Sequence, residues 1–215
     1  MGCGSWLDSC DSEEKPVHRV CVNSFYMAKY EVTQAQWQAI MDSNPSYFKN
    51  CDNCDNYPVE NVSFYDANDF ISRLNKQSNL KGIRLPTEAE WEYSCRSRGK
   101  EEMYCGGNKL DSLGWYYSNS RFNRHPVGLK KPNGLGLYDM SGNVWEWCKD
   151  WYSSDYYQSS IENNPIGPRH GSARVVRGGS WDYYVWNCRS AFRNMKEPGE
   201  RIQYLGLRLA LPLNP

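Results

Sequence analysis

The stretch RLPTEAEWEYSCR, residues 84–96, has the signature of a helix with a defined start. Thr87, followed three positions later by Glu90, matches a capping box, in which each side chain accepts a hydrogen bond from a backbone N–H at the start of the helix. Trp91 and Cys95 are four residues apart, so a helix places them on one face. This stretch therefore predicts a short amphipathic helix.

Two similar helix starts lie earlier in the chain. Thr33 with Gln36 precedes Trp37, and Ser63 with Asp66 precedes apolar residues at i, i+3, i+4 and i+7 spacing over positions 67–74. This spacing gives one apolar face on a helix. Both segments are therefore expected to form half-buried helices.

Beyond residue 97 the helical period disappears. Gly, Pro, Asn and Ser interrupt short apolar runs, which indicates short strands and long ordered loops. Residues 18–32, 175–181 and 205–210 are the clearest strand candidates, so the two ends of the chain are expected to pair in one sheet. No internal repeat or linker interrupts the chain, and we expect a single α+β domain over residues 1–215.

The composition disfavours several classes of partner. Lys plus Arg and Asp plus Glu both total 25, so no net charge attracts nucleic acid or an anionic membrane. The chain has 9 Trp and 16 Tyr at a mean hydropathy of −0.80. Aromatic rings of this kind fill irregular cores and also form binding surfaces, and composition does not separate the two uses.

The cysteine content favours an oxidising compartment. The chain has nine of them, so at least one stays unpaired if the others form bridges. The Cys51–Cys54 pair in CDNCDN is expected to be a loop disulfide or two free thiols rather than a zinc site. No run reaches the ~20 apolar residues of a membrane helix, and we expect no membrane insertion. The start of the sequence does not resemble a signal peptide, so for an exported protein the targeting segment is expected to be absent from this sequence.

Four segments together resemble the formylglycine-generating enzyme, or sulfatase-modifying factor, superfamily. They are residues 14–37, 84–96, 134–152 (GLGLYDMSGNVWEWCKDWY), and 174–181 (RVVRGGSW) with 205–210 (LGLRLA), in family order. The resemblance implies a variant C-type lectin fold with little regular secondary structure. It also implies that the C-terminal segment forms the ligand-facing surface.

The catalytic residues of the family oxidase are not matched. In that enzyme the first of two active cysteines lies two residues beyond the aromatic of the glycine-glycine-serine-aromatic motif, and here that position is Tyr183. Cys188 matches the second by position, but one thiol does not make the reactive pair. His18, His125 and His170 are far apart in sequence, so an iron site like that of the family's sulfoxide synthases is not expected. We therefore expect no catalytic residues.

Calcium is the one cofactor that the resemblance offers. Carried over residue by residue, the ligands are the side chains of Asp139 and Glu146 and the carbonyls of Gly142 and Val144. Hard oxygen donors of this kind suit the ion. The alternative is that Glu146 pairs with a buried arginine between core tryptophans, without a metal.

Residues 175–210 are the predicted variable, ligand-binding segment. Short motifs typical of the family, such as GGSW, NCRSA and LGLRLA, alternate with residues that the family pattern does not fix. This layout resembles the variable proteins of diversity-generating retroelements, in which substitutions arise at adenines of template asparagine codons. Asp, Tyr, Val, Phe and Ile all follow from such codons, whereas Trp186 needs another codon. The predicted binding residues are Asp182, Tyr183, Tyr184, Val185, Trp186, Phe192, Met195, Glu197, Ile202, Gln203 and Tyr204.

The predicted function is non-catalytic ligand binding by a receptor-like or adhesin-like protein, diversified by a retroelement. Exposed rings beside adaptable polar groups are typical of a paratope. The expected partner is a protein or glycan on another cell or on a host, bound by a monomer at the cell surface or outside the cell, with a lipid anchor as one way of attachment. The alternative is a formylglycine-generating-like enzyme or an accessory of one.

Overall fold

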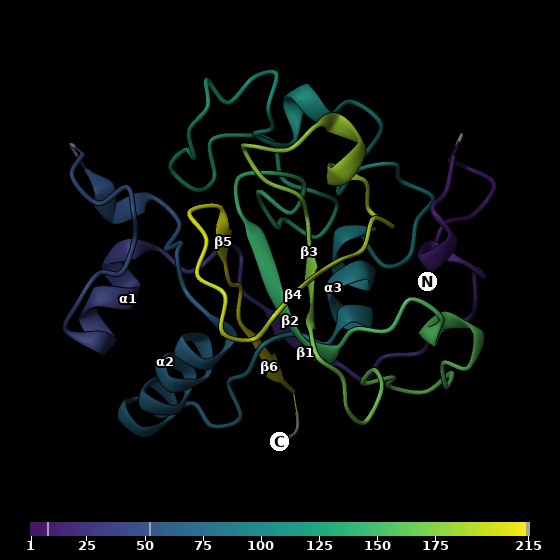
Figure 1. Cartoon of the computed structure of the whole chain (residues 1–215), viewed down its shortest axis with the longest axis horizontal. Helices are drawn as coiled ribbons and strands as arrows, with labels where there is room; N and C mark the ends of the chain where they lie inside the picture. The colour runs from purple at the N-terminus through teal and green to yellow at the C-terminus, as the bar shows by residue number, and fades with distance from the viewer. Residues whose placement is uncertain (8, 52, 214–215) are drawn as a thin grey trace.

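Three α-helices begin where the capping boxes predict: α1 (Gln34–Met41), α2 (Phe64–Gln77) and α3 (Glu88–Cys95) (Figure 1). The computed structural model describes residues 1–7, 9–51 and 53–213. At α3, Glu90 N donates to Thr87 Oγ1 at 3.2 Å and Thr87 N donates to Glu90 Oε2 at 2.9 Å. No α-helix follows residue 97 in this described part of the chain, as the sequence predicts.

A four-stranded sheet forms the centre of the molecule, in the order β4-β3-β2-β5. Its strands are β2 (Trp145–Trp151), β3 (Arg174–Arg177), β4 (Asn194–Lys196) and β5 (Leu205–Gly206). β3 is antiparallel to both of its neighbours, and β5 is parallel to β2. Neither β2 nor β4 is among the strands predicted from the sequence.

The two ends of the chain pair in a second sheet, as expected. In this sheet β1 (Phe25–Met27) runs antiparallel to β6 (Ala210–Pro212), with Tyr26 opposite Leu211. Residues 18–32 thus supply a strand of only three residues. The described part of the chain contains no helix that is long and apolar enough to cross a membrane.

The two faces of β2 pack against different layers. Trp145 and Trp147 point to the side that holds α1 and α2, in a cluster with Phe70 and Leu205. Successive side chains of a strand alternate between its faces. Cys148 accordingly packs on the other side, in a cluster with residues of α3. Both layers therefore depend on this one strand.

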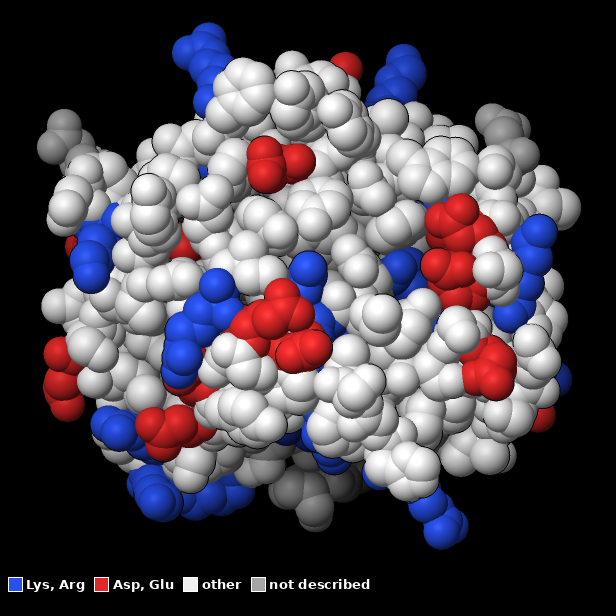
Figure 2. Space-filling view, viewed as in Figure 1, with Lys and Arg blue, Asp and Glu red and all other residues white. Residues whose placement is uncertain are grey.

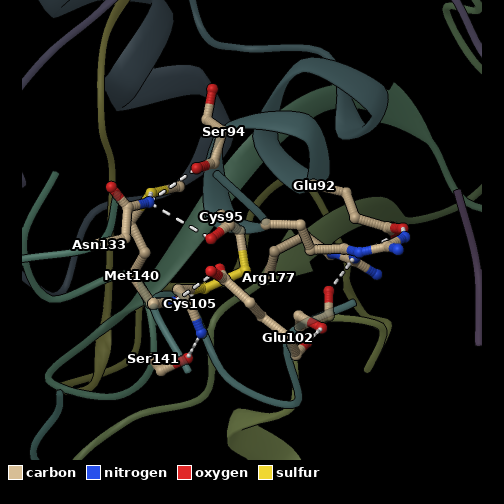
Figure 3. Close-up of a disulfide and its surroundings, with 12 residues drawn as sticks. Glu92, Ser94, Cys95, Glu102, Cys105, Asn133, Met140, Ser141 and Arg177 are labelled. Carbon is tan, nitrogen blue, oxygen red and sulfur yellow. Dashed lines mark hydrogen bonds and ion pairs between the residues drawn. A yellow bond between two sulfur atoms is a disulfide. The ribbon is translucent and has the colours of Figure 1, made fainter. Parts of the chain in front are cut away.

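A disulfide and a buried ion pair fix α3 to its surroundings (Figure 3). Cys95, the last residue of α3, is bonded to Cys105. Asn133 Nδ2 donates to the Ser94 carbonyl at 2.7 Å. On the side of α3 that faces β3, Arg177 donates to Glu92 Oε2 at 2.7 Å.

Candidate functional site: the C-terminal segment

Arginines at intervals hold the C-terminal segment to the rest of the chain. Each donates two or more hydrogen bonds to one carboxylate, which is a strong and geometrically specific contact. The nitrogen–oxygen distances lie between 2.7 and 3.1 Å. The pairs are Arg189 with Glu14, Arg193 with Glu88, Arg201 with Asp66, and Arg208 with Glu146.

The Arg193–Glu88 ion pair is buried, and the arginine charge changes the pKa of Glu88. Burial alone raises the pKa of the Glu88 carboxyl, but the charges of Arg193 and Arg177 outweigh it and hold the pKa below its ordinary value. Both groups stay ionised, because each charge compensates the other in the protein interior. Removing one partner would leave the other as a buried charge without compensation. Position 193 therefore has a structural role.

The family motifs GGSW and NCRSA of this segment lie mostly in the interior. Trp181 and Cys188 are both buried. Gly179 has a φ of +76°, and a Cβ there would come within 2.5 Å of Cys188 Sγ. Only glycine fits that position without displacing its neighbours.

Three of the predicted binding residues are well exposed on one turn. Tyr184 precedes a 3-10 turn over Val185–Cys188, and 63% of its surface is accessible. Val185 and Trp186 are also exposed. Trp186 lies beside the guanidinium of Arg189, with the Arg189 Cζ 3.9 Å from the ring centroid. These positions thus lie on and beside a turn.

A second group of predicted binding residues is half-buried, which corrects the expected exposure of Tyr183. Tyr183, Phe192 and Tyr204 gather around the buried indole of Trp145. The Tyr183 hydroxyl lies 3.4 Å from that of Tyr204. Burial and this contact raise the pKa of Tyr183. These rings extend the core, so the aromatic residues of the predicted binding set do not form one exposed cluster.

The other predicted binding residues vary in exposure. Met195 and Glu197 are exposed, Met195 on the edge strand β4 and Glu197 just beyond it, whereas Asp182, Ile202 and Gln203 are half-buried. Burial raises the pKa of Asp182. The segment therefore offers an uneven surface with both apolar and polar groups.

Thiol chemistry has little support at this site. Cys188 is fully buried, and burial raises its pKa to about 12. Bridges join Cys3 to Cys10, Cys51 to Cys54, and Cys95 to Cys105, and the free cysteines of the described chain are Cys21, Cys148 and Cys188. The loop disulfide in CDNCDN is one of the two expected alternatives. His18 packs against Tyr157, and His125 stacks on Trp115 at 3.7 Å, so both have local packing roles.

One of the expected calcium ligands, Glu146, already has a cationic partner. Glu146 Oε1 accepts from Arg208 Nη2 at 2.7 Å, and Glu146 Oε2 accepts from Trp91 Nε1 at 2.7 Å. Asp139 Oδ2 accepts from Gly128 N at 2.7 Å. Burial raises the pKa of Asp139 to about 6. A fixed cation already lies beside Glu146, which favours the arginine-paired alternative over a metal.

The mixed sheet, the paired ends and the loop-rich second half define a C-type-lectin-like fold. Residues 2–213 match the sulfatase-modifying factor enzyme 1-like domain, and the chain belongs to this family. In structure it is similar to Treponema denticola variable protein 1, with a TM-score of 0.85 and 35% identity over 89% of this chain and 86% of that one. The fold of this chain thus also occurs in a variable protein.

The family also includes enzymes among the relatives of this chain. A formylglycine-generating enzyme of Streptomyces coelicolor is 39% identical over 72% of this chain, which spans 52% of that protein. The chaperone protein LppX of Paenibacillus barcinonensis is 33% identical over 75% of this chain and 71% of its own length. The family therefore does not decide between catalysis and binding.

Proposed function

We propose that this chain is a non-catalytic binding protein that presents residues 175–210 to a ligand. The supporting observation is the division of that segment. Its arginines bind carboxylates of the scaffold, whereas Tyr184, Val185, Trp186, Met195 and Glu197 are exposed. Exchange of the exposed residues changes the surface and leaves the anchors intact.

The similarity to a variable protein supports a retroelement as the source of diversity in this segment. The ligand class of this proposal is a protein or glycan outside the cell, bound at the cell surface or in the extracellular space by one copy of the chain. The enzymatic alternative requires a second thiol beside Cys188, and Tyr183 stands at the position where the family oxidase has one.

Sequencing of the coding locus in independent isolates tests the proposal without knowledge of the ligand. We expect the exposed codons to differ between isolates, and a nearby reverse transcriptase gene with a second copy of the segment that differs only at adenines. The codons for Arg189, Arg193 and Arg208 should be constant. Variation spread evenly over the chain, without such a template copy, would contradict the proposal.

A further inference from the structure

A loop outside the C-terminal segment is built directly on the backbone of that segment. Tyr117 N donates to the Tyr183 carbonyl at 2.9 Å, and Ser120 Oγ donates to the Trp181 carbonyl at 2.8 Å. The stacked pair of Trp115 and His125 closes the base of the loop. Because these contacts use backbone atoms of the segment, they do not depend on which side chains the segment carries.

This loop adds two aromatic rings next to Tyr184. The centroids of Tyr117 and Tyr184 are 4.9 Å apart, and those of Tyr117 and Phe122 are 5.1 Å apart. Phe122 is 63% exposed, which is the same fraction as Tyr184. We call Tyr117, Phe122 and Tyr184 the aromatic ridge.

The backbone at Phe122 is strained. Arg121 and Phe122 are consecutive residues, and each has a φ of +57°. That conformation costs a side chain with a Cβ roughly 1–2 kcal/mol. The exposed ring gains little burial to offset this cost. Persistent strain of this kind is concentrated at ligand-binding positions.

The two sequence segments that carry the ridge contain few charged residues. Arg121 is the only charged residue between Trp115 and Asn123, and Asp182 is the only one between Trp181 and Cys188. Figure 2 shows the upper part of this face mostly white, with one acidic group within it, another at its upper edge, and basic side chains at its rim. Aromatic residues with few charges are typical of the core of a protein–protein interface.

The ring geometry favours a protein over a glycan. Tyr117 and Phe122 are inclined at 88°, and Tyr117 and Tyr184 at 46°. The ridge is therefore knobbed rather than flat, whereas a sugar ring stacks best on one open aromatic face. Aromatic knobs of this kind fill pockets on a partner and contribute much of the binding energy.

We propose that the aromatic ridge is the centre of a protein-binding face, and that its partner contributes an uncharged, apolar patch of a folded protein. The proposal rests on the proposed function for Tyr184, but Tyr117 and Phe122 lie outside the segment 175–210. They give the site a constant part beside its variable part.

The first test needs no ligand. Asn tolerates positive φ better than Phe does, so Phe122→Asn should raise the melting temperature by ~2–4 °C if strain is relieved. Tyr65→Ser is the matched control, because Tyr65 is an exposed aromatic on α2, 64% accessible, outside the ridge. A lower melting temperature for Phe122→Asn would show that the ring has a structural role, and would overturn the proposal.

The second test uses a naive library of small folded binding domains, selected against the whole chain. We expect most selected domains to lose at least ~10-fold in affinity for Phe122→Asn and Tyr117→Ser, and to keep it for Tyr65→Ser, because a few aromatic residues dominate such interfaces. Domains that bind Phe122→Asn as tightly as the wild type would overturn the proposal, as would a selection without binders. Loss in Tyr184→Ser alone would leave the proposed function standing and reject the ridge. Binding to a glycan array through Phe122 would reject the protein partner.

Discussion

The ring of Tyr183 stands edge-on to the indole of Trp145, with centroids 5.2 Å apart and an interplanar angle of 89°. By position, this is where the family oxidase has the first of its two cysteines. The thiol site is thus filled by a packed aromatic ring, whose hydroxyl lies near that of Tyr204. The next residue, Tyr184, points away to the surface. Neighbouring residues of the proposed binding segment therefore have different roles.

Alanine substitutions should separate these two roles. Tyr183→Ala removes a half-buried ring from Trp145 and should lower the free energy of unfolding by about 1–3 kcal/mol, below the range for a fully buried aromatic. Tyr184→Ala should change it by no more than about 0.5 kcal/mol, as is usual for an exposed site. Urea denaturation measures both. Equal losses in the two variants would contradict the division of the segment into anchored and displayed residues.

The free thiols should differ sharply in reactivity. Cys21 is exposed, whereas burial raises the pKa of both Cys148 and Cys188. Since the thiolate is the reactive form, a thiol reagent should modify one cysteine in the native protein and three after unfolding without reductant. Cys21→Ser should abolish the native reaction.

In the same preparation, incubation of a sulfatase-derived cysteine peptide with copper should give no formylglycine by mass spectrometry. Detection of the aldehyde would restore the enzymatic alternative.

The buried carboxyl of Asp150 should make stability depend on pH. Burial, together with the charge of Glu88, raises its pKa to about 8. A carboxyl whose pKa is higher in the folded state holds its proton there, so the folded state is favoured below the unfolded pKa of about 4 and loses stability as pH rises toward 8. Asp150→Asn should therefore stabilise the protein at pH 8 and have little effect at pH 4. Thermal melts across this range, with the exposed Asp42→Asn as control, would show the difference. A parallel profile for Asp150→Asn and wild type would contradict it.

The sequence predicts the helices well because their signals are local. A capping box such as Thr87 with Glu90 needs only four residues, and all three boxes form. The strand β2 is not predicted from the sequence because both of its faces are buried. Glu146 and Cys148 lie in the interior, as Trp145 and Trp147 do. A strand buried on both sides has no alternation of polar and apolar residues to detect.

The site is predicted less completely than the fold. Arg189 lies within the family motif NCRSA, but its partner Glu14 is 175 residues away, and no spacing rule connects them. The exposure of Tyr183 depends on Trp145, which lies far away in sequence, in β2. The ridge residues Tyr117 and Phe122 come from a loop without a motif. Their one local signal is the aromatic-rich composition of residues 115–122, which fits a core equally well.

Calcium should have no effect on the stability of this protein. The Glu146 carboxylate accepts hydrogen bonds from Arg208 and Trp91, so a metal would have to displace a buried cation that already compensates its charge. If a site with a Kd near 10 µM existed, 1 mM calcium would add about 2.7 kcal/mol. That gain would raise the melting temperature by several degrees, since ~1 kcal/mol corresponds to ~2–4 °C in a chain of this size.

Melts of the wild type in 1 mM calcium and in chelator should therefore coincide. Glu146→Gln should lower the melting temperature equally in both buffers, because it leaves Arg208 buried without its full counter-charge. The loss expected from breaking such a pair is ~3–5 kcal/mol. A wild-type melt that rises by several degrees in calcium, together with a Glu146→Gln melt that does not, would show that Glu146 is a metal ligand. The arginine pair would then have to give way to the ion in the native protein.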